Sequence, residues 1–173
     1  MSMQSSMDVV YHVARVCKRK NAKLICSAEP AFELNEHSFP GAYVLVASLS
    51  GIDILLPGKG SLETKIGKLL GSHCENVIIT NEYEGQCILI NSEGRTRFTM
   101  KDFEFVSHTA AIDCFCGALA VALVGGKSLN EAVAYALTGA SLAMSRKGSL
   151  PSLPIAEEIM DNINRVSDTV FEY

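Results

Sequence analysis

A run of small and apolar residues from Thr109 to Val124 carries a single carboxylate, Asp113, close to its beginning. The run has the length of a helix and stops at the pair Gly125-Gly126. A helix N-terminus carries unpaired backbone N–H groups and a partial positive charge, so it is a natural binding site for phosphate. An Asp in the first turn serves as helix cap, as general base, or as both. The simpler interpretation is a capping Asp on a buried helix. The features of the rest of the chain bear on whether Asp113 is structural or catalytic.

The length and the charge of the chain limit what it can be. With 173 residues we expect one domain, residues 1–173, that buries its own core. The net charge of −4 argues against nucleic acid or an anionic membrane as partner, because both require a basic face. The longest apolar stretch, 118–124, is too short to cross a bilayer, and the first residues lack a signal-peptide pattern. These features predict a cytoplasmic protein.

The six cysteines are scattered and lack the C-x-x-C spacing of a zinc or redox site. Cys114 and Cys116 are two residues apart, which places them on different faces of a helix and argues against joint metal ligation. We expect reduced thiols, as is usual in a reducing compartment.

Short apolar runs alternate with amphipathic segments along the chain, a pattern typical of an α/β fold whose mostly parallel sheet is flanked by helices. Ser128 with Glu131 three residues later predicts a capping box. A turn signal at 91–94 predicts a hairpin. Strands are predicted at 23–26, 43–47, 76–80, 86–90, 95–98 and 103–106, and a loop at 28–40. Helices are predicted at 7–19, 48–55, 61–70, 113–124, 128–145 and from 154 onward.

The block from Asp113 to Pro154 resembles the C-terminal part of the ribokinase-like carbohydrate kinases. A helix ending Gly-Ala-Leu-Ala-Val-Ala-Leu is followed by Lys-Ser-Leu-Asn-Glu-Ala-Val and then by Ser-Arg-Lys-Gly-Ser-Leu-Pro-Ser-Leu-Pro. Upstream, residues 80–85 fall where the family has a Thr-x-Gly-x-x-Gly turn, and residues 28–31 where it has an Asn-Pro-Ala-Pro-like turn. The resemblance covers nearly the whole chain. It implies a ribokinase-like three-layer sandwich that lacks the N-terminal lid half.

The resemblance also implies a role for the turn before the helix, which in the family reads Gly-Ala-Gly-Asp or Ala-Ala-Gly-Asp. The backbone N–H groups of that turn hold the transferring phosphoryl group, and its Asp takes the proton from the sugar hydroxyl. Asp113 would then be the general base, with Ala110, Ala111 and Ile112 lining the anion hole and ATP with Mg²⁺ as the donor. Phosphoryl transfer depends mainly on positioning and charge stabilisation, so amides beside one base form a sufficient core.

Several positions depart from the family's pattern. Ile112 stands where the family has glycine, and a β-branched side chain resists both positive φ and the close approach of a phosphate. The Asn-x-x-Glu motif, which resembles a magnesium-and-phosphate site, falls on Ser48 and Gly51, so both functional side chains are gone. Ser107 stands where the monovalent-cation loop begins with Asp.

The resemblance assigns the remaining residues to two groups. The nucleotide side takes Thr80, Glu82, Gly85 and Leu137, of which Glu82 replaces a glycine and Leu137 an adenine-side asparagine. The degenerate monovalent-cation loop takes Ser107, Thr109, Ala143, Arg146, Gly148 and Ser152.

Two functions follow from these features. The favoured one is a degenerate relative that keeps the fold and transfers phosphate weakly or not at all; the alternative is an active sugar kinase with Asp113 as base. His108, five residues before Asp113, is a further candidate for lining the site. Without the lid half, we expect the sheet to have an open edge that a second copy of the chain, in a homo-oligomer, or a separate chain covers. Another expectation is that the chain is a fragment of a longer product. The partners expected are a small sugar and a nucleotide.

Overall fold

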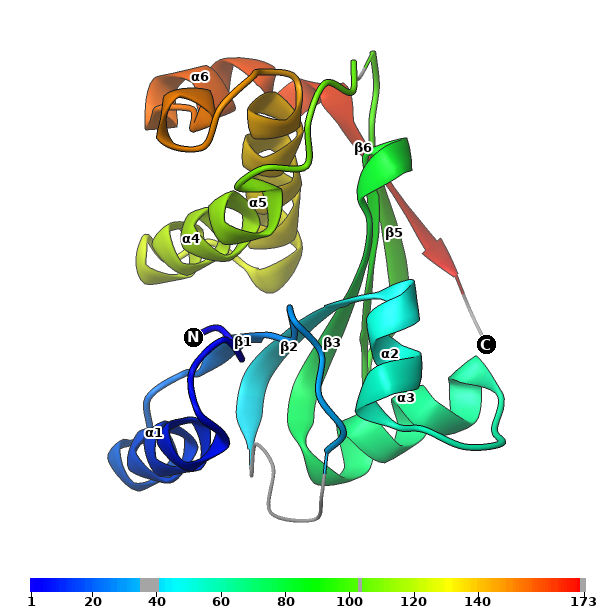
Figure 1. Ribbon diagram of the computed structural model, residues 1–173. Coiled ribbons are helices and arrows are strands. Elements are labelled where there is room, and N and C mark those ends of the chain that lie inside the picture. The colour runs from blue at the N-terminus through cyan, green and yellow to red at the C-terminus, as the bar shows by residue number, and fades with distance from the viewer. Residues whose placement is uncertain (35–40, 103, 172–173) are drawn as a thin grey trace. The chain divides into compact units, whose positions relative to one another are not determined.

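The structure is a computed structural model that describes residues 1–34, 41–102 and 104–171 (Figure 1). Its strands form one six-stranded sheet in the order β1-β2-β3-β4-β5-β6, flanked by helices, which confirms the predicted α/β class. The strands are β1 (Ile25–Ser27), β2 (Ala42–Ser48), β3 (Cys74–Asn81), β4 (Gln86–Asn91), β5 (Gly94–Met100) and β6 (Val166–Phe171). The helices are α1 (Met7–Lys20), α2 (Leu49–Leu55), α3 (Leu62–Ser72), α4 (Ala111–Val124), α5 (Leu129–Met144) and α6 (Ala156–Asn162), with the short helices η1 (Glu82–Glu84), η2 (Leu150–Ser152) and η3 (Ile163–Arg165).

The chain divides into two compact units. The first unit comprises Met1–Thr80 and Ile90–Gly94, and the second comprises Asn81–Leu89 and Arg95–Tyr173. No helix in the described part of the chain combines the length and the apolar character that crossing a membrane requires.

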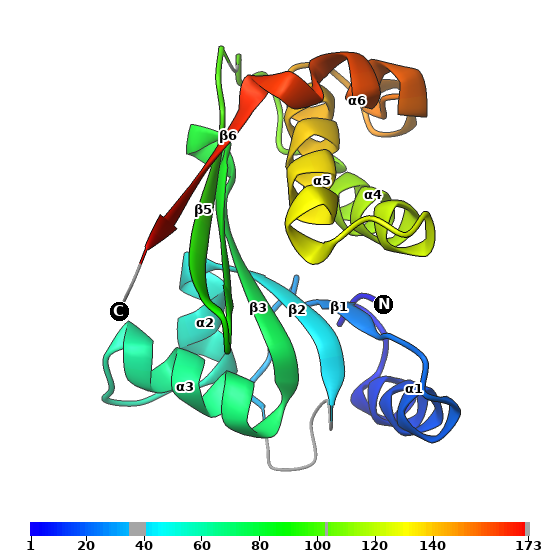
Figure 2. The same ribbon diagram turned by 180° about the vertical axis from the view of Figure 1, so that it is seen from behind.

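In the first unit, three parallel strands lie between α1 on one side and the pair α2 and α3 on the other (Figure 2). β1 pairs with β2, and β2 pairs with β3 up to Ser48 opposite Thr80. The residues Val44, Leu45 and Val46 in β2 are fully buried, as expected for a strand covered on both faces. This pairing places the ends of β2 and β3 beside each other.

Hydroxyl caps begin the two helices that follow β2 and precede β3. The Ser48 side chain accepts from the Gly51 N–H at the start of α2, and Ser61 accepts from the Thr64 N–H at the start of α3. Such caps satisfy amides that the helix itself leaves unpaired. An ion pair of 2.6 Å between Lys65 and Asp53 links α3 to α2.

In the second unit, α4 and α5 pack side by side and α6 lies against α5, in both views of the molecule (Figure 1, Figure 2). Gly139 of α5 faces both of the other helices. A Cβ atom there would lie 3.1 Å from Ile159 Cδ1, 3.4 Å from Cys114 Sγ and 3.5 Å from Ala118 Cβ. The predicted capping box of Ser128 and Glu131 is confirmed at the start of α5. The strands β5 and β6 pair antiparallel.

The structure differs from the sequence prediction in the segment after β5. A strand is predicted at 103–106, but Glu104–Val106 form a loop, and Phe103 lies outside the described residues. The backbone N–H groups of Val106 and Ser107 both donate to the Met144 carbonyl, at 2.9 and 3.0 Å. The segment thus bonds to the end of a helix instead of to a strand.

Smaller differences concern element ends and the C-terminal strand. α4 begins at Ala111, ahead of Asp113, and the last helix begins at Ala156, after Pro154. No strand is predicted from the sequence at β6. The structure shows that none of its residues is buried. Of the loop predicted at 28–40, residues 35–40 lie outside the described part of the chain.

Candidate functional site

The turn at the start of α4 has the features of an anion-binding site. Ala110, the residue before the helix, has φ 63° and ψ 5°, in the left-handed region. The Cys114 N–H makes the first helical hydrogen bond, to the Ala110 carbonyl at 2.9 Å. No side chain caps this helix end in the described part of the chain. The amides of Ile112 and Asp113 therefore have no intrahelical acceptor and are available to an anion.

The resistance of isoleucine to positive φ does not come into play at Ile112. Ile112 is the second residue of α4, has a half-buried side chain, and adopts the helical conformation that isoleucine tolerates. The left-handed residue is Ala110. A residue with a Cβ atom in that conformation costs about 1–2 kcal/mol. What remains at Ile112 is its bulk, because a branched side chain is carried by a residue whose own amide is open.

Replacing Ala110 by glycine should raise the free energy of unfolding by about 0.5–1 kcal/mol, because glycine removes the left-handed strain at a smaller entropic cost. The matched control is Ala111→Gly, one residue further along in the helix, which should lower it by about 1 kcal/mol. Urea denaturation followed by circular dichroism measures both. Equal destabilisation by the two glycines would contradict the assignment of strain to Ala110.

Asp113 lies in the first turn of α4, is exposed, and lines a cavity of about 400 Å³. An accessible carboxylate is what a general base acting on a substrate hydroxyl requires. The rest of the lining is mostly apolar and comes from α4, α5, α6 and the segment between α5 and α6: Ala110, Cys114, Gly117, Ala118, Val121, Tyr135, Ser149, Leu150, Leu153, Pro154, Ala156 and Ile159.

The thiol beside Asp113 is held in its protonated form. Burial, with the neighbouring Asp113 charge as a smaller cause, raises the pKa of Cys114 to about 11. A thiol of that pKa is almost entirely protonated at neutral pH and is a poor nucleophile. All six cysteines are free, as expected. Cys114 therefore contributes shape to the cavity wall and no nucleophile.

The residues assigned to the nucleotide side differ in how accessible they are. Thr80, in the first unit, is buried, and its hydroxyl has no hydrogen-bond partner among the described residues. Gly85, in the second unit, has φ 57°, and its carbonyl accepts from the Met100 N–H at 2.9 Å. Leu137 is buried within α5. Glu82 begins η1 in the second unit.

The segments assigned to the cation loop meet at the end of α5. The Ser107 N–H donates to the Met144 carbonyl, which brings the residues before α4 next to Ala143. The hydroxyl of Ser107 donates to the Thr109 hydroxyl at 2.9 Å. Beyond α5, Gly148 has φ 102°, and the buried Ser152 donates its hydroxyl to the Ser149 carbonyl at 2.6 Å.

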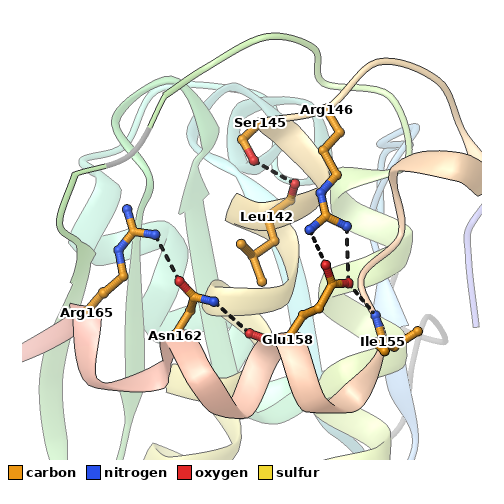
Figure 3. A network of polar contacts seen from close by, with 7 residues as sticks. All are labelled: Leu142, Ser145, Arg146, Ile155, Glu158, Asn162 and Arg165. Atoms are coloured by element: carbon orange, nitrogen blue, oxygen red, sulfur yellow. Dashed lines mark hydrogen bonds and ion pairs between the residues drawn. The ribbon is translucent and has the colours of Figure 1, made fainter.

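Arg146, also assigned to this loop, is joined to α6 (Figure 3). Its guanidinium donates to both carboxylate oxygens of Glu158, at 2.6 and 3.2 Å, and Glu158 also accepts from the Ile155 N–H at 3.0 Å. The hydrogen bond from Arg146, followed by that from the Ile155 N–H, lowers the pKa of Glu158, and the same carboxylate raises the pKa of Arg146. The arginine thus fixes the start of α6 against the end of α5.

The Glu158 contacts predict a stability that depends on pH. Because the folded protein binds the Glu158 proton more weakly than the unfolded chain, this stabilisation is present above the usual pKa of 4.5 and is lost as the pH falls through the lowered value. Glu158→Gln should flatten the acid limb of a stability profile from urea midpoints. The neighbouring Glu157→Gln is the control and should keep the wild-type slope; identical profiles for the two variants would contradict the prediction.

The residues that replace the magnesium motif, Ser48 and Gly51, lie next to the carboxylate of Glu29. Ser48 Oγ accepts from the Gly51 N–H at 3.1 Å and donates to Glu29 Oε1 at 2.7 Å. A Cβ atom at Gly51 would lie 3.3 Å from the same Glu29 oxygen, so this carboxylate lies directly beside the place of a side chain at position 51. Glu29 already accepts two bonds from Ser48. Among the described residues, no three His, Cys, Asp or Glu side chains gather as metal ligands, and Glu29 is the carboxylate that contacts Ser48 at this motif.

Sequence reasoning missed two features of the chain. Glu29 reaches Ser48 from a distant loop, and no local spacing indicates that contact. Tyr83, Phe105 and His108 form an aromatic cluster, with the His108 ring centroid 4.6 Å from each of the other two. His108, the further candidate for lining the site, is not among the described residues that line the 400 Å³ cavity.

Comparison with known proteins identifies the family of this chain. Residues 2–156 match the pfkB family of carbohydrate kinases. The chain belongs to this family. It is 24% identical over 177 residues to the ribokinase of Haemophilus influenzae, covering 93% of this chain and 54% of that relative.

Solved structures agree on the fold. A ribokinase of Thermotoga maritima superposes with a TM-score of 0.84 at 27% identity, covering 94% of this chain and 55% of the other. The Arabidopsis thaliana ribokinase complexed with ribose and ATP gives 0.83 at 20% identity, with 94% and 54% covered. The ribokinase-like fold is therefore confirmed, and this pfkB-family chain spans about half the length of the relatives it matches.

Proposed function

We propose that this chain is a degenerate ribokinase-type domain that binds the phosphates of a nucleotide weakly and transfers phosphate to a sugar slowly or not at all. One feature carries the proposal: the first turn of α4 keeps two open amides and the exposed Asp113, but one of the two open residues, Ile112, carries a branched side chain where the family has glycine. The anion-binding backbone and the base are present. The small residue that would let a phosphate approach them is not.

The expected impairment is large. Removing one oxyanion donor typically lowers a rate by about 10²–10³. A side chain that keeps the phosphoryl group away from both open amides removes the same kind of stabilisation. At the magnesium motif, Ser48 itself carries no charge, and the Glu29 carboxylate beside it accepts two hydrogen bonds from Ser48.

The alternative is an active sugar kinase that uses Asp113 as base and ATP with Mg²⁺ as donor. It is favoured by the exposure of Asp113 in the first turn of α4, beside a cavity of about 400 Å³. A positioned base contributes about 10²–10⁴ to a rate, so a retained base alone permits measurable turnover. The substrate in this alternative would be a sugar of the class that the Arabidopsis ribokinase structure contains.

Ribose-dependent ADP release separates the two functions. The assay compares the wild-type chain with Asp113→Asn, and uses Haemophilus influenzae ribokinase as the positive control. We expect wild type and variant to give the same low signal. Ribose-dependent release at a rate comparable to that of the positive control, lost in Asp113→Asn, would overturn the degenerate function in favour of the active kinase.

A further inference from the structure

A second cavity of the second unit shares no lining residue with the Asp113 cavity, and the proposed kinase chemistry does not use it. It has a volume of about 250 Å³ and lies between the end of β5, the segment after it, α5 and η3. Its polar lining consists of Asp102, Glu104, Ser141, Ser145 and Arg165. All of these residues belong to the second unit.

Ser141 is the unusual member of this lining. It is 1% exposed, and its hydroxyl has no hydrogen-bond partner among the described residues. Two other hydroxyls of this helix and its C-cap bond back to helix carbonyls: Thr138 to Ala134 and Ser145 to Leu142, each at 2.8 Å. Buried hydroxyls are nearly always paired. A hydroxyl left unpaired at a polar cavity is therefore available to a ligand.

Arg165, the cation among the described lining residues, is already engaged. It donates to Asn162 Oδ1 at 3.0 Å and to the carbonyl oxygens of Lys101 and Asp102 (Figure 3 shows the bond to Asn162). The carboxylates of Asp102 and Glu104 leave this lining with one excess negative charge. The cavity thus presents mainly acceptors, and a ligand with several N–H donors and a positive charge complements it.

The size of the cavity further limits which ligands fit it. A volume of about 250 Å³ is more than a bare alkali ion fills. Met100 and Leu142 add an apolar part to the wall. We propose that this cavity binds a small molecule carrying a primary ammonium group. The N–H groups of the ammonium would donate to the Ser141 hydroxyl and to the carboxylates of Asp102 and Glu104. The proposal does not depend on kinase activity.

Amide NMR titration of the full chain tests the proposal with ethanolammonium as the probe and ethylene glycol, its uncharged counterpart of similar size, as the control. Ethanolammonium should shift the amides of Ser141 and Ser145 saturably, and ethylene glycol should not. The double variant Asp102→Asn with Glu104→Gln should weaken binding at least tenfold, because it removes the charge without changing shape. Asp161→Asn, an exposed acid outside the cavity lining, should leave binding unchanged.

Ser141→Ala separates binding from folding. It should weaken ethanolammonium binding several-fold and leave the melting temperature unchanged or higher, because the lost hydroxyl has no partner among the described residues. Three results would overturn the proposal: no saturable shift with ethanolammonium, equal affinity for ethylene glycol, or full affinity in the double variant.

Discussion

Gly139→Leu should lower the free energy of unfolding by about 3 kcal/mol, at the upper end of what overpacking usually costs. A Cβ atom at this position would already lie 3.1 Å from Ile159 Cδ1 and 3.5 Å from Ala118 Cβ. A leucine adds further carbons to a space shared by α4, α5 and α6. The change should therefore separate the helices that hold Asp113 and Glu158. Urea denaturation followed by far-ultraviolet circular dichroism measures the loss.

Gly117→Leu is the matched control for this prediction. Gly117 lies in α4 and is exposed, and a Cβ atom added there would meet no atom within 4 Å. Leucine there should keep or raise the stability by up to about 1 kcal/mol, because it is the better helix former. Similar losses at positions 117 and 139 would show that the closeness of the three helices at Gly139 is not what limits stability.

The elements that sequence reasoning located correctly are those that local chemistry specifies. The Ser128 and Glu131 side chains satisfy each other's amides within one helical turn, so their spacing alone predicts the start of α5. The turn between β4 and β5 is likewise encoded in four consecutive residues. The loop at Glu104–Val106 is different, because its bonding partner, the Met144 carbonyl, lies at the far end of α5 and no local pattern predicts it.

The same distinction between local and distant contacts applies to the candidate site. The position of Asp113 in the first turn of an apolar helix follows from the residues around it, and the structure places it there. The left-handed residue could not be located from the sequence, because alanine at position 110 gives no signal of positive φ. The contacts of Glu29 with Ser48 and of Arg146 with Glu158 join segments 19 and 12 residues apart, and neither spacing belongs to a local motif.

Ile112→Gly should tighten ATP binding by about tenfold, which corresponds to about 1.4 kcal/mol. Its backbone is already helical, so the change requires no new conformation and only removes a branched side chain from a residue whose amide is open. Phosphate would then reach the N–H groups of residues 112 and 113. Isothermal titration calorimetry with ATP measures the difference, and a thermal melt of the variant checks that the fold survives a glycine in the first turn.

Ile112→Val is the control for that change, since it keeps the branch at Cβ and should bind ATP as weakly as wild type. Asp113→Asn placed on the Ile112→Gly background should retain the tighter binding, because the amides and not the carboxylate hold the phosphate. It should also abolish any ribose-dependent ADP release that the glycine restores, because the base is then gone. Unchanged ATP affinity in a folded Ile112→Gly variant would mean that the side chain at position 112 is not what closes the anion-binding turn.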